Sequence, residues 1–280
     1  MFSREFYLAA IKNFIPAYTH VHFLRLKNLD VPVEDFSKFF NLPRDWQQVA
    51  QAWFEKQAKT SSVLHMGAFN YPKGLLSLEN PPMFLFFHGD LGCLNRRSVA
   101  IVGARETFRE TQVWIEKELQ EGLRQQELTV VSGGARGIDQ AAHFMALRMN
   151  LPTCVVLPSA LDRPYPELWI QWKDEVLARG GLILSEYPAN TEMRKYHFLR
   201  RNELLAAITA GCFVVQASRR SGTLLTARWV QQLGRSLSAL CHFPHSKTMG
   251  SLDLISEGAT LIRDGRDLHV WLESLPTGFF

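Results

Sequence analysis

The sequence predicts an α/β protein in which a doubly wound, mostly parallel sheet follows a small helical domain. Two observations support this fold class. Apolar residues recur at helical spacing over residues 1–60, whereas short apolar runs alternate with helix-length segments from Arg97 onward. The 280 residues are sufficient for one large α/β domain with a smaller one attached. We therefore predict a helical domain over 1–65 and a sheet domain over 66–280.

The N-terminal region is predicted to form three or four short helices. Aromatic residues such as Phe6, Phe36 and Trp53 are spaced for helix faces, and Pro32 and Pro43 separate the segments. An aromatic stripe of this kind is more typical of a core than of a binding site.

Residues 60–95 are predicted to form a connector between the two domains. The apolar run Met83–His88 is bounded by Asn80-Pro81-Pro82 and by Gly89-Asp90, which are turn signals. We expect a short buried strand here that packs on the sheet domain.

From Arg97 onward the pattern predicts parallel strands. Ser98–Val102 is an apolar strand, and Thr107–Glu110 matches a capping box that would begin the next helix. Helix-length sequence separates each strand from the next, which favours a parallel sheet with helices on both faces and ligands beyond the strands' carboxyl ends. The later strands are predicted at Leu128–Val131, Thr153–Leu157, Gly181–Leu184, Cys212–Gln216 and Ser236–Leu240.

The composition excludes several protein classes. Hydrophobic residues make up 46% and charged residues 21%, values typical of globular proteins. The longest apolar stretch, Leu204–Ala217, is shorter than the ~20 residues of a membrane helix, and no signal-peptide pattern is present, so we expect a cytoplasmic protein without membrane contact. The four cysteines form no C-x-x-C pair and no two histidines have metal-ligand spacing, so we expect reduced thiols, no metal and no cofactor.

The positive charge is concentrated in one segment. The net charge is only +4, but residues 194–235 hold eight basic residues and one acid, Glu203, a local net charge of +7. Such a segment is typical of a surface that binds a polyanion, although arginines distributed around two helices explain it as well.

Glycines and polar residues gather where the predicted strands end. The glycines of segment 132–137 allow sharp turns that point backbone N–H groups at a phosphate, and Arg105 and Arg136 add bidentate donors. A tight strand-to-helix turn explains any single loop equally well. The two loops together with Ser221–Thr223, which begins a third helix, favour a phosphate site.

The same loops lack the signatures of common nucleotide enzymes. Gly103–Phe108 does not match G-x-G-x-x-G, and no P-loop sequence occurs. Asp139, Asp162 and Glu186 fall near strand ends, as general acids or bases would, but stabilisation of a helix dipole explains Asp139 equally well.

A series of short motifs runs through residues 70–262. Its members are Tyr71-Pro72, Pro81-Pro82, Gly89, Val99–Arg105, Ser132–Asp139 with Ala142-His143, Leu161-Asp162 with Tyr165-Pro166, Ser185–Pro188, Phe198–Asn202, Ser221–Ala227 and Gly258-Ala259. In this order the series resembles the DprA/Smf family of DNA-processing, DNA-protecting proteins. The resemblance implies an extended Rossmann-like domain that forms a homodimer, binds single-stranded DNA without catalysis and hands the strand to the RecA recombinase in natural transformation.

The resemblance also implies which residues contact DNA. Arginine and lysine side chains and the glycine backbone would hold phosphates, and Phe198 would stack on a base, unless it is a core residue at a helix start. The implied DNA-binding residues are Gly103, Arg105, Gly133, Gly134, Arg136, Gly137, Lys195, Phe198, Arg200 and Arg201; no catalytic residue is implied.

The chain departs from the family pattern at several positions. Glu203 stands where a second arginine is usual, His242-Phe243-Pro244 replaces a proline-glycine pair, and Leu252 occupies a common asparagine position. The N-terminal segment resembles a sterile-alpha-motif-like domain in size but lacks the G-I-G hairpin. The chain ends at Phe280, about where other members begin a winged-helix domain, so we expect that domain to be lacking.

An enzyme is the main alternative function. Nucleoside-monophosphate phosphoribohydrolases share this type of fold and resemble P-G-G-x-G-T-x-x-E at the corresponding turn. Here the stretch Ser218–Leu225 lacks both the glycine pair and the acid, which argues against that chemistry. A third hypothesis is a scaffold that uses the helical N-terminus to bind partners.

Overall fold

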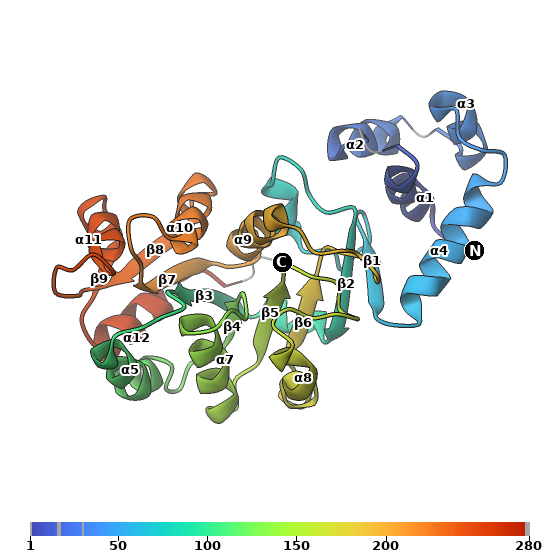
Figure 1. Ribbon diagram of the computed structural model, residues 1–280. Helices are drawn as coiled ribbons and strands as arrows, with labels where there is room; N and C mark the ends of the chain where they lie inside the picture. The colour runs from blue at the N-terminus through green and yellow to red at the C-terminus, as the bar shows by residue number, and fades with distance from the viewer. Residues whose placement is uncertain (1, 16–17, 30, 278–280) are drawn as a thin grey trace.

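A nine-stranded sheet forms the centre of the protein. The computed structural model describes residues 2–15, 18–29 and 31–277, so Met1 and residues 278–280, at the outer ends of the two predicted domains, lie outside the described residues. The strand order is β1-β2-β6-β5-β4-β3-β7-β8-β9 (Figure 1). The strands are β1 (Ser62–His65), β2 (Phe84–Gly89), β3 (Arg97–Gly103), β4 (Leu128–Ser132), β5 (Thr153–Leu157), β6 (Leu182–Ser185), β7 (Gly211–Gln216), β8 (Ser236–Leu240) and β9 (Thr260–Ile262).

The strand order contains a topological switch point. The chain proceeds from β3 through β4 and β5 to β6 in one direction, and then resumes on the other side of β3 with β7, β8 and β9. All of these neighbours pair in parallel, whereas β1 and β2 are antiparallel additions at one edge. The predicted mostly parallel, doubly wound sheet is therefore confirmed. Loops diverge where the order reverses, so the crevice beside the end of β3 is the expected ligand position.

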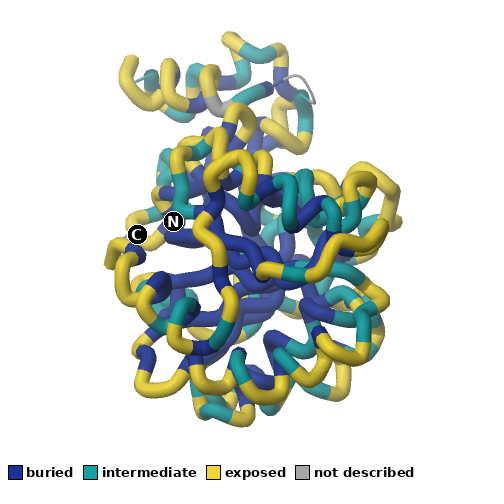
Figure 2. The backbone as a smooth tube through the Cα atoms, turned by 90° about the vertical axis from the view of Figure 1, so that its left-hand side faces the viewer, coloured by how far each residue is buried: buried dark blue, intermediate teal, exposed yellow. Residues whose placement is uncertain are grey.

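Helices cover both faces of the sheet. Successive side chains of β3 point to opposite faces and are buried on both, so each face needs a cover. Ala100 and Val102 pack in one hydrophobic cluster with residues of α9, α10 and α11, whereas Val99 and Ile101 pack in a second cluster with residues of α7 and α12 (Figure 1). Figure 2 shows the strands as a buried core inside exposed helix faces and turns. The helices of this region are α5 (Arg109–Trp114), the π-helical segment η5 (Ile115–Leu119), α6 (Gln120–Gly122), α7 (Ile138–Arg148), α8 (Leu168–Ala178), α9 (Lys195–Ala207), α10 (Gly222–Gln232), α11 (Met249–Ser256) and α12 (Gly265–Ser274), with 3₁₀ turns η3 (Lys73–Ser77) and η4 (Leu91–Asn95) before them.

Two local predictions differ from the structure. The capping box over Thr107–Glu110 is wrong, because α5 begins at Arg109 with Phe108 as its N-cap residue. The Phe108 N–H and the Thr111 hydroxyl both donate to Gln216 Oε1, so a contact with β7 determines where the helix begins. Segment 60–95 is more than a connector, since it supplies β1 and β2 to the sheet.

The N-terminal helices pack against the β1 edge of the sheet (Figure 1). Phe84 of β2 lies between them, with its ring centroid 6.2 Å from that of Phe6 and 4.9 Å from that of Trp53. Gln57 is buried, and its Oε1 accepts a hydrogen bond of 2.7 Å from the Ala189 N–H. The aromatic stripe is thus a core, as predicted. The elements are α1 (Arg4–Ala10), η1 (Ile11–Asn13), α2 (His20–Asn28), η2 (Val33–Asp35), α3 (Phe36–Phe40) and α4 (Trp46–Ala58).

The described residues include the segments on which the membrane and cysteine predictions depend. Within residues 2–15, 18–29 and 31–277, no helix has both the length and the apolar character needed to cross a bilayer. All four cysteines are free thiols, of which Cys93, Cys154 and Cys212 are buried and Cys241 is exposed.

Replacing Phe84 with alanine is expected to destabilise the protein by about 3–5 kcal/mol, because the substitution empties a buried aromatic site shared by α1, α4 and β2. Chemical denaturation measures the change, and limited proteolysis is expected to reveal earlier cleavage of the N-terminal helices. Phe39→Ala is the matched control, since Phe39 is 64% exposed. Equal stability of the two variants would contradict the shared core.

Candidate nucleic-acid interface

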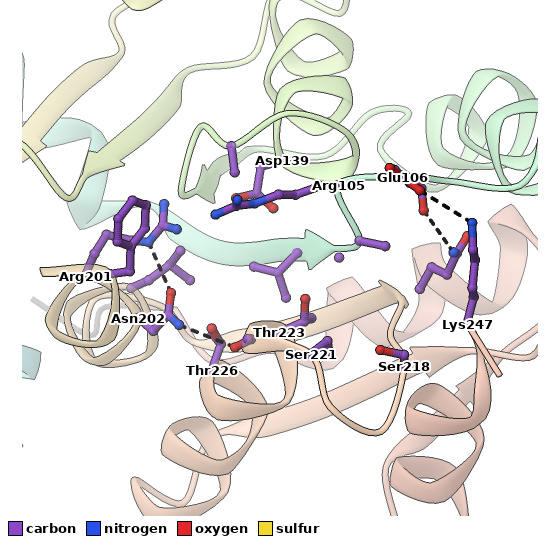
Figure 3. Close-up of a pocket in the computed structure, with 18 residues that line it drawn as sticks. Arg105, Glu106, Asp139, Arg201, Asn202, Ser218, Ser221, Thr223, Thr226 and Lys247 are labelled. Atoms are coloured by element: carbon purple, nitrogen blue, oxygen red, sulfur yellow. Dashed lines mark hydrogen bonds and ion pairs between the residues drawn. The ribbon is translucent and has the colours of Figure 1, made fainter. Parts of the chain in front are cut away.

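A pocket lies at the switch point of the sheet. Its cavity of about 400 Å³ is lined by the loop after β3, the loop after β7 and the N-terminal turns of α9 and α10 (Figure 3). The register of β3 against β7 shifts between Val102 and Gly103, where the pocket begins. The topology therefore locates the cavity at the position where open α/β sheets bind ligands.

Arg105 and Phe198 meet at this pocket. The Arg105 side chain is exposed and its guanidinium carbon lies 5.9 Å from the centroid of the half-buried Phe198 ring. Figure 3 shows the Arg105 side chain extending across the pocket beside Asp139. Tyr165 contacts Phe198 edge-to-face, with centroids 5.8 Å apart. The arrangement presents a cation and an aromatic ring to the same ligand.

Arg201 forms the buried wall of the pocket. Its Nη1 donates to the carbonyl oxygens of Gly133 and Val156, and its Nε donates to Asn202 Oδ1 at 3.1 Å. Burial lowers the pKa of Arg201, and the carboxylate of Asp139 counteracts this effect. The side chain is only 8% exposed, so the main role of Arg201 is to hold α9 against the ends of β4 and β5.

Asp139 lies beside Arg201 in the first turn of α7. Burial raises the pKa of this carboxyl group, whereas Arg201, the N–H groups of Ala135 and Gly103 and a hydrogen bond with Ser132 lower it. The carboxylate is therefore occupied by groups of the protein itself. This environment explains Asp139 as a structural partner of the loop and of Arg201 rather than as a catalytic acid.

The glycine loop after β4 is shaped by close packing. The carbonyl of Gly133 binds Arg201, and a Cβ at this position would lie 1.7 Å from Arg201 Nη1. The carbonyl of Gly134 accepts a hydrogen bond of 3.0 Å from Trp169 Nε1. Gly137 has φ +91°, and a Cβ there would lie 2.4 Å from the Ala104 carbonyl oxygen. These glycines adjoin the cavity without lining it, and exposed Arg136 lies on the same loop.

Arg200 and Arg201 face different surroundings. Arg200 forms ion pairs with Glu186, at 3.0 Å, and with Glu203, and it donates to the Asn80 carbonyl at 2.8 Å. Arg200 does not line the pocket at the switch point. It lines a second cavity, of about 430 Å³, which residues of the N-terminal region also line. Lys195 is exposed at the start of α9. The pocket at the switch point thus brings together Gly103, Arg105, Phe198 and Arg201 of the predicted residues, with Lys195, Arg136 and the glycines nearby and Arg200 turned away.

The structure adds three observations in or beside the pocket that sequence reasoning did not supply. Tyr165 was part of a motif but was given no contact, although its ring flanks Phe198. Ser221 Oγ, at the start of α10, is buried without a hydrogen-bond partner among the described residues. Lys247 lines the far end of the pocket, 3.6 Å from Glu106. Lys247 gave no signal because it lies outside the basic segment and the motif series.

The family described as DNA recombination-mediator protein A matches residues 62–273. The chain belongs to this family. Protein Smf of Escherichia coli K12 is 29% identical over 272 residues, which cover 97% of this chain and 71% of that protein. DNA processing protein DprA of Streptococcus pneumoniae is 37% identical over 202 residues, 71% of this chain and 70% of that protein.

Solved structures of family members share the fold. The X-ray structure of DprA from Streptococcus pneumoniae has a TM-score of 0.82 at 27% identity and covers 99% of both chains. DNA processing protein A from Helicobacter pylori, whose structure concerns its single-stranded DNA binding mode, has a TM-score of 0.67 at 30% identity over 77% of this chain and 97% of that one. The family resemblance and the extended Rossmann-like fold class are thereby confirmed. The family is one of recombination mediators, which bind DNA and are not catalysts.

Metal chemistry has no support in the described part of the chain, where no cluster of three or more histidine, cysteine or acidic side chains is arranged to hold an ion.

His143, one turn after Asp139, is expected to make the protein sensitive to acid. It is buried, its Nδ1 lies 2.7 Å from the Thr153 hydroxyl, and burial lowers its pKa to about 3. Below pH 6.5 His143 is protonated in the unfolded chain but stays neutral in the folded chain. The free energy of unfolding therefore falls as the pH decreases toward 3. Between pH 7 and pH 5 this loss is about 2 kcal/mol.

The measurement is chemical denaturation of the wild type and of His143→Gln at both pH values. The wild type should lose more stability between pH 7 and pH 5 than the variant does. An equal loss in both proteins would contradict the assignment of a buried neutral histidine.

Proposed function

We propose that this chain binds single-stranded DNA at the pocket of the switch point, protects it, and loads the RecA recombinase onto it during natural transformation. The main support for the proposal is the contact between Arg105 and Phe198, in which the guanidinium carbon lies 5.9 Å from the ring centroid. A guanidinium binds a phosphate and an aromatic face stacks on a base, so the pair suits one nucleotide of an open strand.

Phosphate contacts would extend on both sides of this pair. Lys195 is exposed at the start of α9, and Arg136 is exposed on the loop after β4. Gly222 and Thr223 line the pocket, so the first turn of the 11-residue helix α10 faces the ligand with the positive end of its dipole. Such contacts neutralise the backbone without reading its sequence.

The pocket would discriminate against duplex DNA through its aromatic group. A paired base is stacked between its neighbours and cannot present its face to Phe198 without unstacking, which costs a few kcal/mol. A single strand offers its bases at no such cost. Preference for single strands is therefore expected from the half-buried ring rather than from the charges.

The relatives support the biological part of the proposal. The family is described as a recombination mediator, and the Helicobacter pylori relative has a described single-stranded DNA binding mode. A mediator holds a strand until a recombinase replaces it, which requires contacts that are individually weak and reversible. Exposed arginine and lysine contacts with phosphates meet that requirement. This role implies action in the cytoplasm, where RecA and the incoming strand meet.

We also propose a homodimer and a two-domain organisation. β9 is an edge strand of the sheet and carries the exposed Leu261, so a second copy of the chain is a suitable cover for that edge. The helices α1 to α4 precede the first strand, β1, which is consistent with a helical domain that ends close to the proposed boundary at residue 65.

The alternative enzyme gains no support. The loop before α10 lacks the required acid, and Asp139 is held by Arg201 and the neighbouring loop. Membership of the mediator family favours DNA binding over cleavage of a nucleoside monophosphate.

The double variant Arg105→Ala, Lys195→Ala is expected to bind a labelled oligothymidine at least tenfold more weakly than the wild type. It removes two phosphate contacts, so the slope of log affinity against log salt should fall by about 1.4. Fluorescence anisotropy over a salt series measures both quantities, and the same titration with a duplex is expected to give weaker binding.

Arg25→Ala, Lys56→Ala is the charge-matched control, because it removes two cations from α2 and α4. If both double variants lose the same affinity, the binding is non-specific and the pocket assignment is wrong. If the wild type does not bind the oligothymidine at all, the proposed function is wrong.

A further inference from the structure

The loop that follows β8 carries an exposed aromatic cluster. The Phe243 side chain is 51% exposed, and its ring centroid lies 5.5 Å from that of Phe108. His245 contacts Phe108 edge-to-face at 4.9 Å. These three rings, which we call the β8-loop platform, come from segments more than 130 residues apart in the chain. A group of exposed aromatic rings on a protein surface is typical of a site that binds a ligand or partner.

The backbone of this loop is held in place. Thr248 is fully buried, and its hydroxyl donates to the Phe243 carbonyl at 2.8 Å while it accepts from the His245 N–H at 3.1 Å. His245 Nδ1 in turn accepts from the Lys247 N–H at 3.1 Å. The rings are therefore presented by an ordered turn, and a ligand that stacks on them pays little conformational entropy.

The platform continues the pocket at the switch point. Lys247 and Glu106 line that pocket, and Lys247 Nζ also lies 5.7 Å from the centroid of the Phe108 ring. In Figure 3, Lys247 and Glu106 occupy the end of the pocket opposite Arg201 and Asn202. A strand that enters beside Phe198 and crosses the pocket would leave it next to the platform.

The charge at this exit suits a phosphate. The ion pair between Lys247 and Glu106 is 3.6 Å long, and the two side chains are 49% and 82% exposed. Exposed pairs of this kind contribute little to stability, so a phosphate can replace the carboxylate as the partner of Lys247. Rings beside such a cation match the alternation of bases and phosphates in a single strand.

We propose that the β8-loop platform is a second stacking site for single-stranded DNA, in which Phe243 receives a base and Lys247 the adjoining phosphate. This inference rests on the proposed function and extends the path of the strand from Phe198 across the pocket to residues 243–247. The sequence His242-Phe243-Pro244 makes the platform a feature of this chain, and it sets the length of strand that one molecule covers.

The test is oligothymidine binding by the full chain and by Phe243→Ala. Stacking by one exposed ring is expected to be lost in the variant, which should weaken binding of an oligomer of about 12 nucleotides by about fivefold or more. An oligomer of about 4 nucleotides, which fills only the pocket, should bind both proteins equally. Phe243→Trp should retain the affinity for the longer oligomer, and Lys247→Gln should lower its salt slope by about 0.7.

Photo-crosslinking supplies an independent readout. Oligomers with 5-iodouracil, which crosslinks to stacked aromatic side chains, are expected to label Phe243 or Phe108 in the wild type, as mapped by mass spectrometry. Phe39→Ala is the control for loss of an exposed phenylalanine, and thermal melting verifies that Phe243→Ala remains folded.

The outcomes separate the inference from the function on which it rests. If the wild type binds DNA through Arg105 and Lys195 but Phe243→Ala binds the longer oligomer equally well, with no crosslink at Phe243 or Phe108, the second stacking site is refuted and the proposed function stands. If the wild type does not bind DNA, both are wrong.

Discussion

The pocket depends on the buried guanidinium of Arg201. It ties α9 to the carbonyl oxygens of Gly133 and Val156 at the ends of β4 and β5, and Asp139 balances its charge. A buried cation without partners would cost several kcal/mol, so the loop that bears Gly133 must lie against it. The absence of a side chain at Gly133 makes this approach possible. Arg201 thus fixes the wall of the pocket beside the exposed cations Arg105 and Lys247.

The charge that reaches a ligand is smaller than the sequence suggests. Of the basic residues in segment 194–235, Arg200 is paired with Glu186 and Glu203, and Arg219 is paired with Asp253 at 2.6 Å. The pocket is lined by the buried Arg201 of that segment and by two exposed cations from outside it, Arg105 and Lys247. The local density of cations along the chain therefore predicts a class of ligand, but three-dimensional folding decides which cations are available to it.

The strands β3 to β8 were predictable because each is a mostly apolar run whose residues are largely buried. β5 and β8 begin and end at the predicted residues, and β4, β6 and β7 differ by a single position at their ends. β1 and β9 were not predicted. They have four and three residues, respectively, and such short edge strands are too short to show a period-2 pattern of apolar residues. The N-terminus of α5 was misplaced because a tertiary contact with Gln216 replaces the local cap.

The pocket was predictable only in part. The loops after β3 and β4 and the start of α9 were located from motifs, but adjacent residues on a helix point about 100° apart, and no pattern distinguished Arg200 from Arg201. Lys247 and Phe243 reach the pocket region through a turn whose position depends on the buried Thr248. Contacts of that kind follow from the packing of distant segments and have no local signature.

Hydrogen–deuterium exchange of the full chain, with and without a saturating oligothymidine, tests the central claim most directly. A strand bound at the switch point is expected to slow exchange in the loops at 103–107 and 218–224 and in the first turn of α9, while the helices α1 to α4 exchange at their original rates. Slower exchange confined to those N-terminal helices, with the loops at the switch point unchanged while DNA is bound, would contradict the account.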